Sequence, residues 1–290
     1  MTPIDKAGIY DITSEQYHSQ ACCVGPSISS SGLRKISREC PARYWATSDL
    51  NPAGRQAADK DAFAFGRAAH ALVLGEPEFD KHFVVSPYDT FRTKDAQQWR
   101  EEQTRTVLRN EEMAVVREMA AAQQATWGVR KAFTAGRPEQ SVIWCDDETG
   151  VWLKSRPDWL PDKPGLRFIV EYKTCHTIEP KRLSEDVFKY GYEMQAAMLI
   201  DGVQQVLGVQ PLGVAHVVQE KDYPYLCDLR MFTKEQVEFG RWQYRRALRT
   251  FAECLNTGKW PPYTEGAQFF DTPYWVTKAM ENANVLYADA

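Results

Sequence analysis

The alternation of apolar and polar residues along the chain predicts helices and strands in a mixed order. Apolar residues spaced three and four apart, as on one face of a helix, predict helices over residues 32–36, 62–74, 96–124 and 179–207, and a last helix that Thr233 caps and that runs to about residue 257. Short apolar runs bounded by turn residues predict strands over 140–145, 151–153, 166–172, 213–220 and 223–231. This order is typical of an α/β (α+β) domain with a mixed central β-sheet flanked by helices.

The composition is that of an ordinary globular domain. The chain has 290 residues, of which 43% are hydrophobic and 26% charged. No apolar run reaches the roughly 18 residues of a membrane-spanning helix, and the N-terminus lacks the basic-then-apolar layout of a signal peptide. We therefore expect a cytoplasmic protein with no membrane partner. We expect a single domain with an N-terminal arm and helix over 1–60, a core over 61–265 and a C-terminal tail over 266–290.

Cysteine usage and net charge exclude several classes of protein. The 7 cysteines include no C-x-x-C spacing, which argues against a zinc ribbon, a disulfide framework and an iron–sulfur cluster. Reduced thiols are expected instead. A net charge of −4 and a pI of about 5.8 are not typical of a nucleic-acid-binding protein. A metal-dependent nuclease is still compatible with them, because it needs clustered acids and can confine its basic residues to one groove.

The most informative stretch is 150–173. Two strand-like runs, 151–153 and 166–172, flank a predicted turn at 161–165, and Asp158 precedes that turn. Glu171 and Lys173 are two apart on a strand and therefore share a face, while Tyr172 faces away. A closed hairpin would bring Asp158 to Glu171 and create a site for a hard divalent cation such as Mg²⁺. The alternative is a surface ion pair on an edge strand.

Several other residues have both a structural and a functional interpretation. His70 is either a satisfied core or surface residue, or a metal ligand or phosphate contact. Glu139 opens a strand and could point toward Asp158, whereas residues 146–148 are expected to form an exposed turn. Gln195 borders an apolar helix face, as a rim residue or as a group that orients water or phosphate. The serines of 27–31 are interpreted as helix caps, with phosphate contact as the alternative.

These segments together resemble the PD-(D/E)xK nuclease superfamily. More closely, they are similar to the C-terminal nuclease domain of the exonuclease VIII (RecE-type) family of phages and prophages. The resemblance covers about residues 9–276 in the family's order. It is carried by residues 27–36 with 40–41 and Tyr44, and by residues 66–74, 138–144, 150–158, 169–174, 190–195 and 257–263.

The resemblance implies a role for each matching position. Asp158, Glu171, Lys173 and Gln195 would be the catalytic residues. Mg²⁺ or Mn²⁺, one or two ions per site, would be held by the residues that match the family's metal ligands: His70, Glu139, Asp158, Glu171 and the backbone carbonyl of Tyr172. Candidates for DNA contact are Arg67, Arg92 and Lys94, together with Arg241, Arg245 and Arg249. This last row lies on one helix face and is either a solvated stripe or a phosphate-binding ridge.

The implied activity is that of a Mg²⁺-dependent exonuclease that degrades linear double-stranded DNA, 5′ to 3′, in a bacterial host cell. The 3′ single-stranded tails would serve phage-type recombination by strand annealing. The implied partners are double-stranded DNA, a single-strand annealing protein, and further copies of the chain in a ring of three or four. The alternatives are an endonuclease, a repair or CRISPR-associated nuclease of the same fold, and a catalytically inactive DNA-binding module.

Overall fold

A mixed five-stranded sheet forms the centre of the computed structural model, which describes residues 2–55, 64–162 and 168–283. The strand order is β11-β10-β9-β8-β5, and β9 and β10 run parallel while the other pairs are antiparallel. The mixed sheet confirms the sequence-based expectation. The strands are β5 (Gly136–Pro138), β8 (Trp159–Pro161), β9 (Phe168–Cys175), β10 (Gly213–Glu220) and β11 (Cys227–Met231).

A second sheet shows that the predicted hairpin was wrong in its first strand. Its order is β1-β6-β7-β2, and the segment predicted as 151–153 is β7, which pairs with β6 and β2 and not with β9. The short strand β8 pairs with β9 instead, at Trp159 and Val170. Pro157 lies between β7 and β8, and a proline has no N–H for a sheet ladder, so the chain can change sheets there. The predicted turn falls largely on 163–167, outside the described residues. The strands are β1 (Gly8–Tyr10), β2 (Ser27–Ser29), β6 (Ser141–Cys145) and β7 (Trp152–Ser155).

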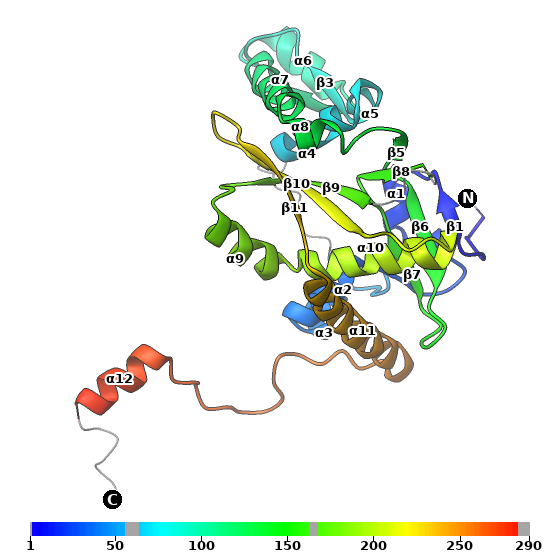
Figure 1. Cartoon of the computed structure of the whole chain (residues 1–290), viewed down its shortest axis with the longest axis vertical. Helices are drawn as coiled ribbons and strands as arrows, with labels where there is room; N and C mark the ends of the chain where they lie inside the picture. Colours follow the sequence, from blue (N-terminus) through cyan, green and yellow to red (C-terminus); the bar gives the residue numbers. More distant parts are fainter. Residues whose placement is uncertain (1, 56–63, 163–167, 284–290) are drawn as a thin grey trace, which may run out of the picture.

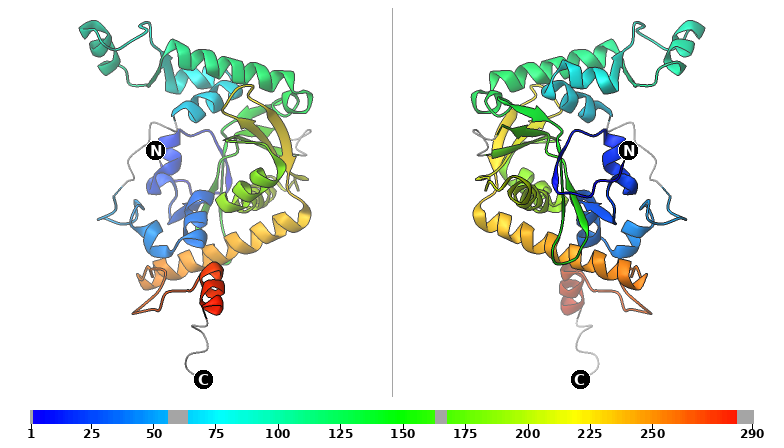
Figure 2. Two further views of the ribbon diagram at one scale, coloured as in Figure 1. Left: turned by 90° about the vertical axis from the view of Figure 1, so that its left-hand side faces the viewer. Right: turned by 90° about the vertical axis from the view of Figure 1, so that its right-hand side faces the viewer.

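The connection between β9 and β10 consists of two helices where one was predicted over 179–207. The helix α9 (Pro180–Tyr190) ends at Gly191, and α10 (Tyr192–Leu207) begins directly after it. Gly191 has a φ of 69°, a left-handed conformation that glycine adopts without strain and that interrupts the helix. The two views of Figure 2 show α10 enclosed between strands of the two sheets. Its apolar residues, including Met194, Met198 and Leu199, form the main core with both sheets and α11.

A lobe of short elements covers the other face of the five-stranded sheet (Figure 1). The prediction of one helix over 96–124 was wrong, because β4 separates α6 from α7 and pairs with β3. The β-branched residues Thr106 and Val107 favour a strand at that point. Ala69 of α4 packs with Val170 and Tyr172 of β9, which fixes the lobe to the sheet. The elements are α4 (Ala64–Leu74), α5 (Glu76–His82), β3 (Phe83–Val85), α6 (Lys94–Glu101), β4 (Thr106–Leu108), α7 (Asn110–Ala125) and α8 (Trp127–Arg130).

The chain ends complete the domain. The N-terminal segment expected to be an arm joins the second sheet, since β1 pairs with β6. The predicted final helix is confirmed as α11 (Lys234–Thr257), capped by the Thr233 side chain. Gly240 lets α11 cross α10 closely, since a Cβ there would lie 2.1 Å from the Glu193 carbonyl oxygen. The remaining helices are α1 (Ser14–His18), η1 (Gln20–Cys22), α2 (Ser30–Arg38), α3 (Pro41–Trp45) and α12 (Tyr274–Asn282).

Two further expectations can be compared with the structure. All the cysteines are free thiols, as expected. Within the described residues, no helix has the length and hydrophobicity of a membrane span.

Candidate active site

Asp158, Glu171 and Lys173 converge at the middle of β9, as the sequence predicted. The Lys173 Nζ lies 2.6 Å from Glu171 Oε2 and 3.8 Å from Asp158 Oδ2. Tyr172 points to the opposite face, where its hydroxyl donates to Gln219 Oε1 at 2.6 Å. The period of two along the strand therefore places one acid and one ammonium together. Asp158 reaches them from the corner between β7 and β8.

Backbone hydrogen bonds fix Asp158 at this corner. The Tyr172 N–H donates to Asp158 Oδ2 at 2.6 Å. The Glu139 N–H donates to the Asp158 carbonyl oxygen at 3.1 Å. Glu139 itself has a φ of 47°, in the left-handed region that non-glycine residues rarely adopt. Two segments that are far apart in sequence are thus joined directly beside the carboxylate.

His70 and Glu139 extend the cluster toward the lobe. His70 Nε2 lies 2.9 Å from Asp158 Oδ1, and His70 Nδ1 lies 3.9 Å from Glu139 Oε1. The Arg156 guanidinium holds Glu139 from the other side, with Nη2 3.1 Å from Glu139 Oε2 and Nε donating to the Glu139 carbonyl oxygen at 2.9 Å. The structure therefore brings together the predicted ligand side chains in one row from Glu139 to Glu171.

Gln195 joins the cluster from the first turn of α10. Its Nε2 donates to Glu171 Oε2 at 2.8 Å. Glu171 is fully buried, and its Oε1 has no hydrogen-bond partner among the described residues. A buried carboxylate oxygen without a donor is costly. The oxygen is therefore a candidate ligand atom.

The charges shift one another's pKa values. Burial, and then the nearby Asp158 charge, raise the pKa of Glu171 to about 7. Burial would also raise the pKa of Asp158, but His70, Lys173 and the Tyr172 N–H outweigh it and hold that pKa well below its usual range. Burial lowers and the two carboxylates raise the pKa of Lys173, with the net effect upward. Lys173 is therefore a firmly protonated ammonium. The pKa of His70 is likewise raised, because Asp158 outweighs burial.

Two cavities reach the edge of this cluster, and Glu139 lines both. The first, of about 240 Å³, is lined by Gln195, Glu139, Arg156, Ser155 and the N-terminal serines of α2. The second, of about 510 Å³, lies under the lobe and is lined by His70, Glu139, Arg67, Lys81 and Arg105. The Arg156 Nη1 and Ser155 Oγ atoms have no hydrogen-bond partner among the described residues. The cavities therefore bring basic and hydroxyl groups next to His70, Glu139 and Gln195, at the edge of the cluster.

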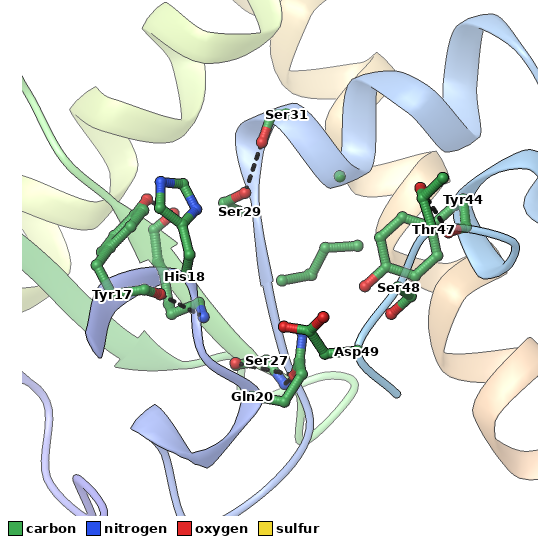
Figure 3. A pocket seen from close by; sticks show the side chains of 13 residues that line it. Tyr17, His18, Gln20, Ser27, Ser29, Ser31, Tyr44, Thr47, Ser48 and Asp49 are labelled. Carbon is green, nitrogen blue, oxygen red and sulfur yellow. Dashed lines mark hydrogen bonds between the residues drawn. The ribbon is translucent and has the colours of Figure 1, made fainter. Parts of the chain in front are cut away.

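A third cavity, of about 250 Å³, shares Tyr17 and His18 with the first (Figure 3). The buried Lys154 ammonium contributes to its lining and donates to the carbonyl oxygens of Tyr17 and Ser19. Ser29 precedes α2 but makes no side-chain capping bond, and its hydroxyl bonds that of Ser31 instead. The capping prediction was therefore wrong at Ser29, because its hydroxyl bonds the Ser31 hydroxyl instead of a backbone N–H of α2. Both serines line this cavity.

The predicted DNA contacts lie in different places. Arg67 lines the cavity under the lobe. Arg92 and Lys94 lie at the start of α6 and line neither cavity that adjoins the site. The row on α11 is engaged with acids: Arg241 pairs with Asp201 and Glu238, Arg245 with Asp146 and Glu148, and Arg249 with Glu148. Asp146 is buried in that pairing, so it does not belong to an exposed turn.

The sequence interpretation missed Arg156, Arg105 and Lys81. Arg156 was signalled only by its position two residues before Asp158, whereas Lys81 and Arg105 reach the cavity through the fold of the lobe. Among the described residues, no group of three or more His, Cys, Asp or Glu side chains has the geometry to hold a metal ion. The predicted ligands are adjacent, but they bond Lys173, His70 and Gln195 instead of converging on one point.

Comparison with known proteins agrees with this architecture. The profile of a family described as "PDDEXK-like domain of unknown function (DUF3799)" matches residues 29–273. The crystal structure of a protein from Eubacterium rectale, described as a "Putative exonuclease", is similar with a TM-score of 0.62 and 15% sequence identity, over 93% of this chain and 98% of that chain. At this identity the likeness concerns the fold, and it confirms the fold class expected from the sequence. No curated protein matches the chain.

Proposed function

This chain belongs to the PDDEXK-like family DUF3799, and we propose that it is a metal-dependent nuclease that hydrolyses phosphodiester bonds in DNA. The observation that carries the proposal is the buried, partly unpartnered Glu171 carboxylate, which shares the Lys173 ammonium with Asp158. Paired carboxylates beside a lysine, next to cavities whose linings include His70, Glu139, Gln195 and basic groups, suit the hydrolysis of a phosphodiester.

The residues fit a divalent cation in their chemistry. Asp158 and Glu171 offer the hard oxygen ligands that Mg²⁺ and Mn²⁺ prefer, and Glu171 Oε1 has no other partner among the described residues. His70, Glu139 and the Tyr172 carbonyl are the further ligand candidates. When bound, the cation would polarise the scissile phosphate and make a bound water more acidic. The Lys173 ammonium supplies the positive charge between these carboxylates in the structure.

The side chains of the chain then have distinct roles in the proposed reaction. Lys173 stays protonated, because both carboxylates raise its pKa. It therefore donates hydrogen bonds to the attacking water or to the phosphate oxygens and stabilises the charge that develops there. Gln195 orients Glu171 through the 2.8 Å hydrogen bond and can rotate toward a water or phosphate. Arg156 positions Glu139, which in turn faces His70.

We further propose the exonuclease mode: degradation of linear double-stranded DNA from the 5′ end, leaving 3′ single-stranded tails. The support is the resemblance of the motifs to the exonuclease VIII family, and the structural similarity to the protein described as a "Putative exonuclease". A ring of three or four copies and a single-strand annealing protein as partner belong to the same proposal. The cavity under the lobe, with Arg67 and Arg105, is the proposed path of the DNA backbone.

The test compares one DNA in two forms. Purified protein with Mg²⁺ or Mn²⁺ is incubated with a linear duplex and with the same plasmid as a covalently closed circle. We expect nucleotide release from the linear form, none from the circle, and loss of 5′-labelled ends before 3′-labelled ends. Cleavage of the circular DNA would show that the protein is an endonuclease and would overturn the exonuclease proposal. No release from either DNA with either metal would favour a DNA-binding module without activity.

A further inference from the structure

A separate cavity of about 210 Å³ lies between α9 and the edge of the five-stranded sheet. It is lined by apolar groups of α9, β10 and β11, together with Tyr192 at the start of α10. Its rim includes Met231, which is 55% exposed, so the cavity lies at the surface. None of these groups has a role in the proposed reaction.

Four rings line this cavity and contact one another in sequence. The Phe188 and Phe232 rings meet edge to face with centroids 5.8 Å apart, and Phe232 meets His216 in the same way at 5.2 Å. The Tyr192 and His216 rings are parallel within 1°, with centroids 6.4 Å apart. Flat rings in fixed orientations favour the binding of another flat ring, because aromatic groups attract one another in stacked and edge-to-face geometries.

One residue of this lining, His216, has a buried polar atom without a partner among the described residues. His216 is 4% exposed, and its Nε2 makes no hydrogen bond with any residue that the structure describes. A buried ring nitrogen without a partner costs free energy that a ligand with a donor or acceptor on its edge would recover. An aliphatic ligand would leave the nitrogen unsatisfied. The lining therefore suits a planar heteroaromatic ring.

The cavity adjoins the candidate active site directly. In the parallel pairing of β9 and β10, Glu171 is opposite His216, and Lys173 is opposite Val218, which also lines the cavity. The Lys173 Nζ lies 5.8 Å from the centroid of the Tyr192 ring. Tyr192 thus stands between the ammonium of the site and the aromatic cavity.

We propose that this cavity is a nucleobase-binding subsite, which takes one unpaired base of the substrate strand next to the scissile phosphodiester. The proposal rests on the proposed nuclease function. The rings of Phe188, Tyr192 and Phe232 hold the base by stacking and edge contacts, and His216 Nε2 bonds its polar edge. Such stacking tolerates every base, since each has a π-face. Capture of a base frayed from the duplex end fixes the position of the neighbouring phosphate relative to Lys173.

The experiment measures binding separately from cleavage. A Lys173→Ala chain is titrated against a blunt DNA duplex, and against duplexes in which one of the terminal nucleotides is replaced by an abasic tetrahydrofuran residue. Fluorescence anisotropy gives each Kd. We expect one abasic position to weaken binding about tenfold, the size of one lost base–aromatic stack. Adding Phe232→Leu, or Phe188→Leu if the first variant folds poorly, should abolish the difference between intact and abasic DNA.

The matched control is Trp242→Leu. Trp242 is an exposed aromatic residue of α11 that stacks on Phe239 and does not line this cavity, so the tenfold difference should persist. Equal affinity for intact and abasic duplexes, an undiminished difference in Phe232→Leu, or no DNA binding at all would overturn the subsite. These outcomes are separable from failure of the proposed function. If the wild-type chain binds intact DNA more tightly than abasic DNA but releases no nucleotides, the base-binding subsite is supported and the nuclease activity is not.

Discussion

Two clusters of acids and bases in this fold differ in how completely their side chains are paired. The α11 cluster consists of Asp146, Glu148, Arg245 and Arg249, and its two acids each receive guanidinium contacts. Asp146 Oδ2 also accepts hydrogen bonds from the backbone and side chain of Thr149. The β9 cluster consists of His70, Asp158, Glu171, Lys173 and Gln195. There, two carboxylates share one ammonium, and Glu171 Oε1 lacks a donor in the described part of the chain.

The difference separates a structural cluster from a functional one. In the α11 cluster, the hydrogen-bonded acids tie the turn after β6 to the last long helix, so the pairing is itself sufficient to account for the residues. In the β9 cluster, the buried acid is left with an unpaired acceptor in the described part of the chain, and its neighbours Gln195 and His70 line the two cavities. Native structures rarely leave buried polar atoms unpaired, and those that remain are often found at functional sites. The unequal pairing is therefore open to direct test.

The largest expected effect comes from removing one cation from each cluster. Lys173→Ala should lower the rate of nucleotide release from linear duplex DNA by about 10³-fold, because it removes the donor to the developing charge. Arg245→Ala removes one positive charge from the α11 cluster and should leave the rate within about twofold, since that cluster does not line the cavities of the site. Single-turnover kinetics with saturating Mg²⁺ measure both. If both variants lost the same fraction of the rate, the loss would come from the change in the net charge of the protein and not from the β9 cluster.

A smaller loss is expected when the orienting amide is removed. Gln195→Ala leaves both carboxylates and Lys173 in place but deletes the 2.8 Å hydrogen bond to Glu171. Groups that orient a metal ligand typically contribute 10- to 100-fold to affinity or activity, so we expect a loss of roughly that size. The same kinetic measurement, repeated over a range of Mg²⁺ concentrations, shows whether added metal restores part of the rate. Gln195→Glu keeps the size of the side chain but adds a like charge, and should be the worse of the two variants.

The sequence predicted the β9 cluster better than the fold around it. The period of two along a strand is enough to place Glu171 and Lys173 together, and that pairing holds whichever strand lies beside β9. The strand predicted to pair with β9 was wrong. The apolar run at 151–153 could belong to either sheet, and only Pro157 indicates that the chain passes from one sheet to the other. Asp158 nevertheless reaches Glu171, because it lies at the corner between the two sheets.

Other errors came from signals that act over a short range and are easily outweighed. The charged, alanine-rich pattern of 96–124 favours a helix, but Thr106 and Val107 form β4 once β3 is available to pair with it. The helix over 179–207 is interrupted by one glycine, whose left-handed φ no apolar pattern reveals. The arginine row on α11 could not be assigned from sequence, because all its acidic partners except Glu238 lie about 40 or 100 residues away.

The two clusters should also respond unequally to neutralisation of an acid. Glu171→Gln removes a buried charge with one unpaired oxygen and leaves Lys173 paired with Asp158, so we expect the free energy of unfolding without metal to change by less than about 1 kcal/mol. Asp146→Asn breaks a buried pairing with Arg245 and should cost about 1–3 kcal/mol. Thermal denaturation with and without Mn²⁺ measures both effects. Metal should raise the Tm of Asp146→Asn but no longer raise that of Glu171→Gln; a metal-induced shift that survives in Glu171→Gln would remove this acid from the ligand set.

Mild acid should lower the stability of the protein through His216, which lies opposite Glu171 on β10, and not through the α11 cluster. Burial, with a smaller effect of the Lys173 charge, lowers the pKa of His216 to about 3, from the ordinary value of 6.5. Below pH 6.5 the unfolded chain binds a proton at this imidazole that the folded chain excludes, so this contribution to stability is complete above pH 6.5 and is lost as pH falls toward 3.

We therefore expect the wild type to lose about 1.4 kcal/mol per pH unit relative to His216→Gln between about pH 6 and pH 4.5. Urea unfolding in the presence of a chelator measures the two curves, and any constant cost of burying the glutamine cancels from their slopes. Asp146→Asn is the matched variant in the α11 cluster. It should run parallel to the wild type, because it leaves the His216 imidazole and the groups around it in place. Parallel curves for His216→Gln and the wild type would mean that the imidazole is already protonated in the folded chain, and that the lining of the aromatic cavity carries a charge.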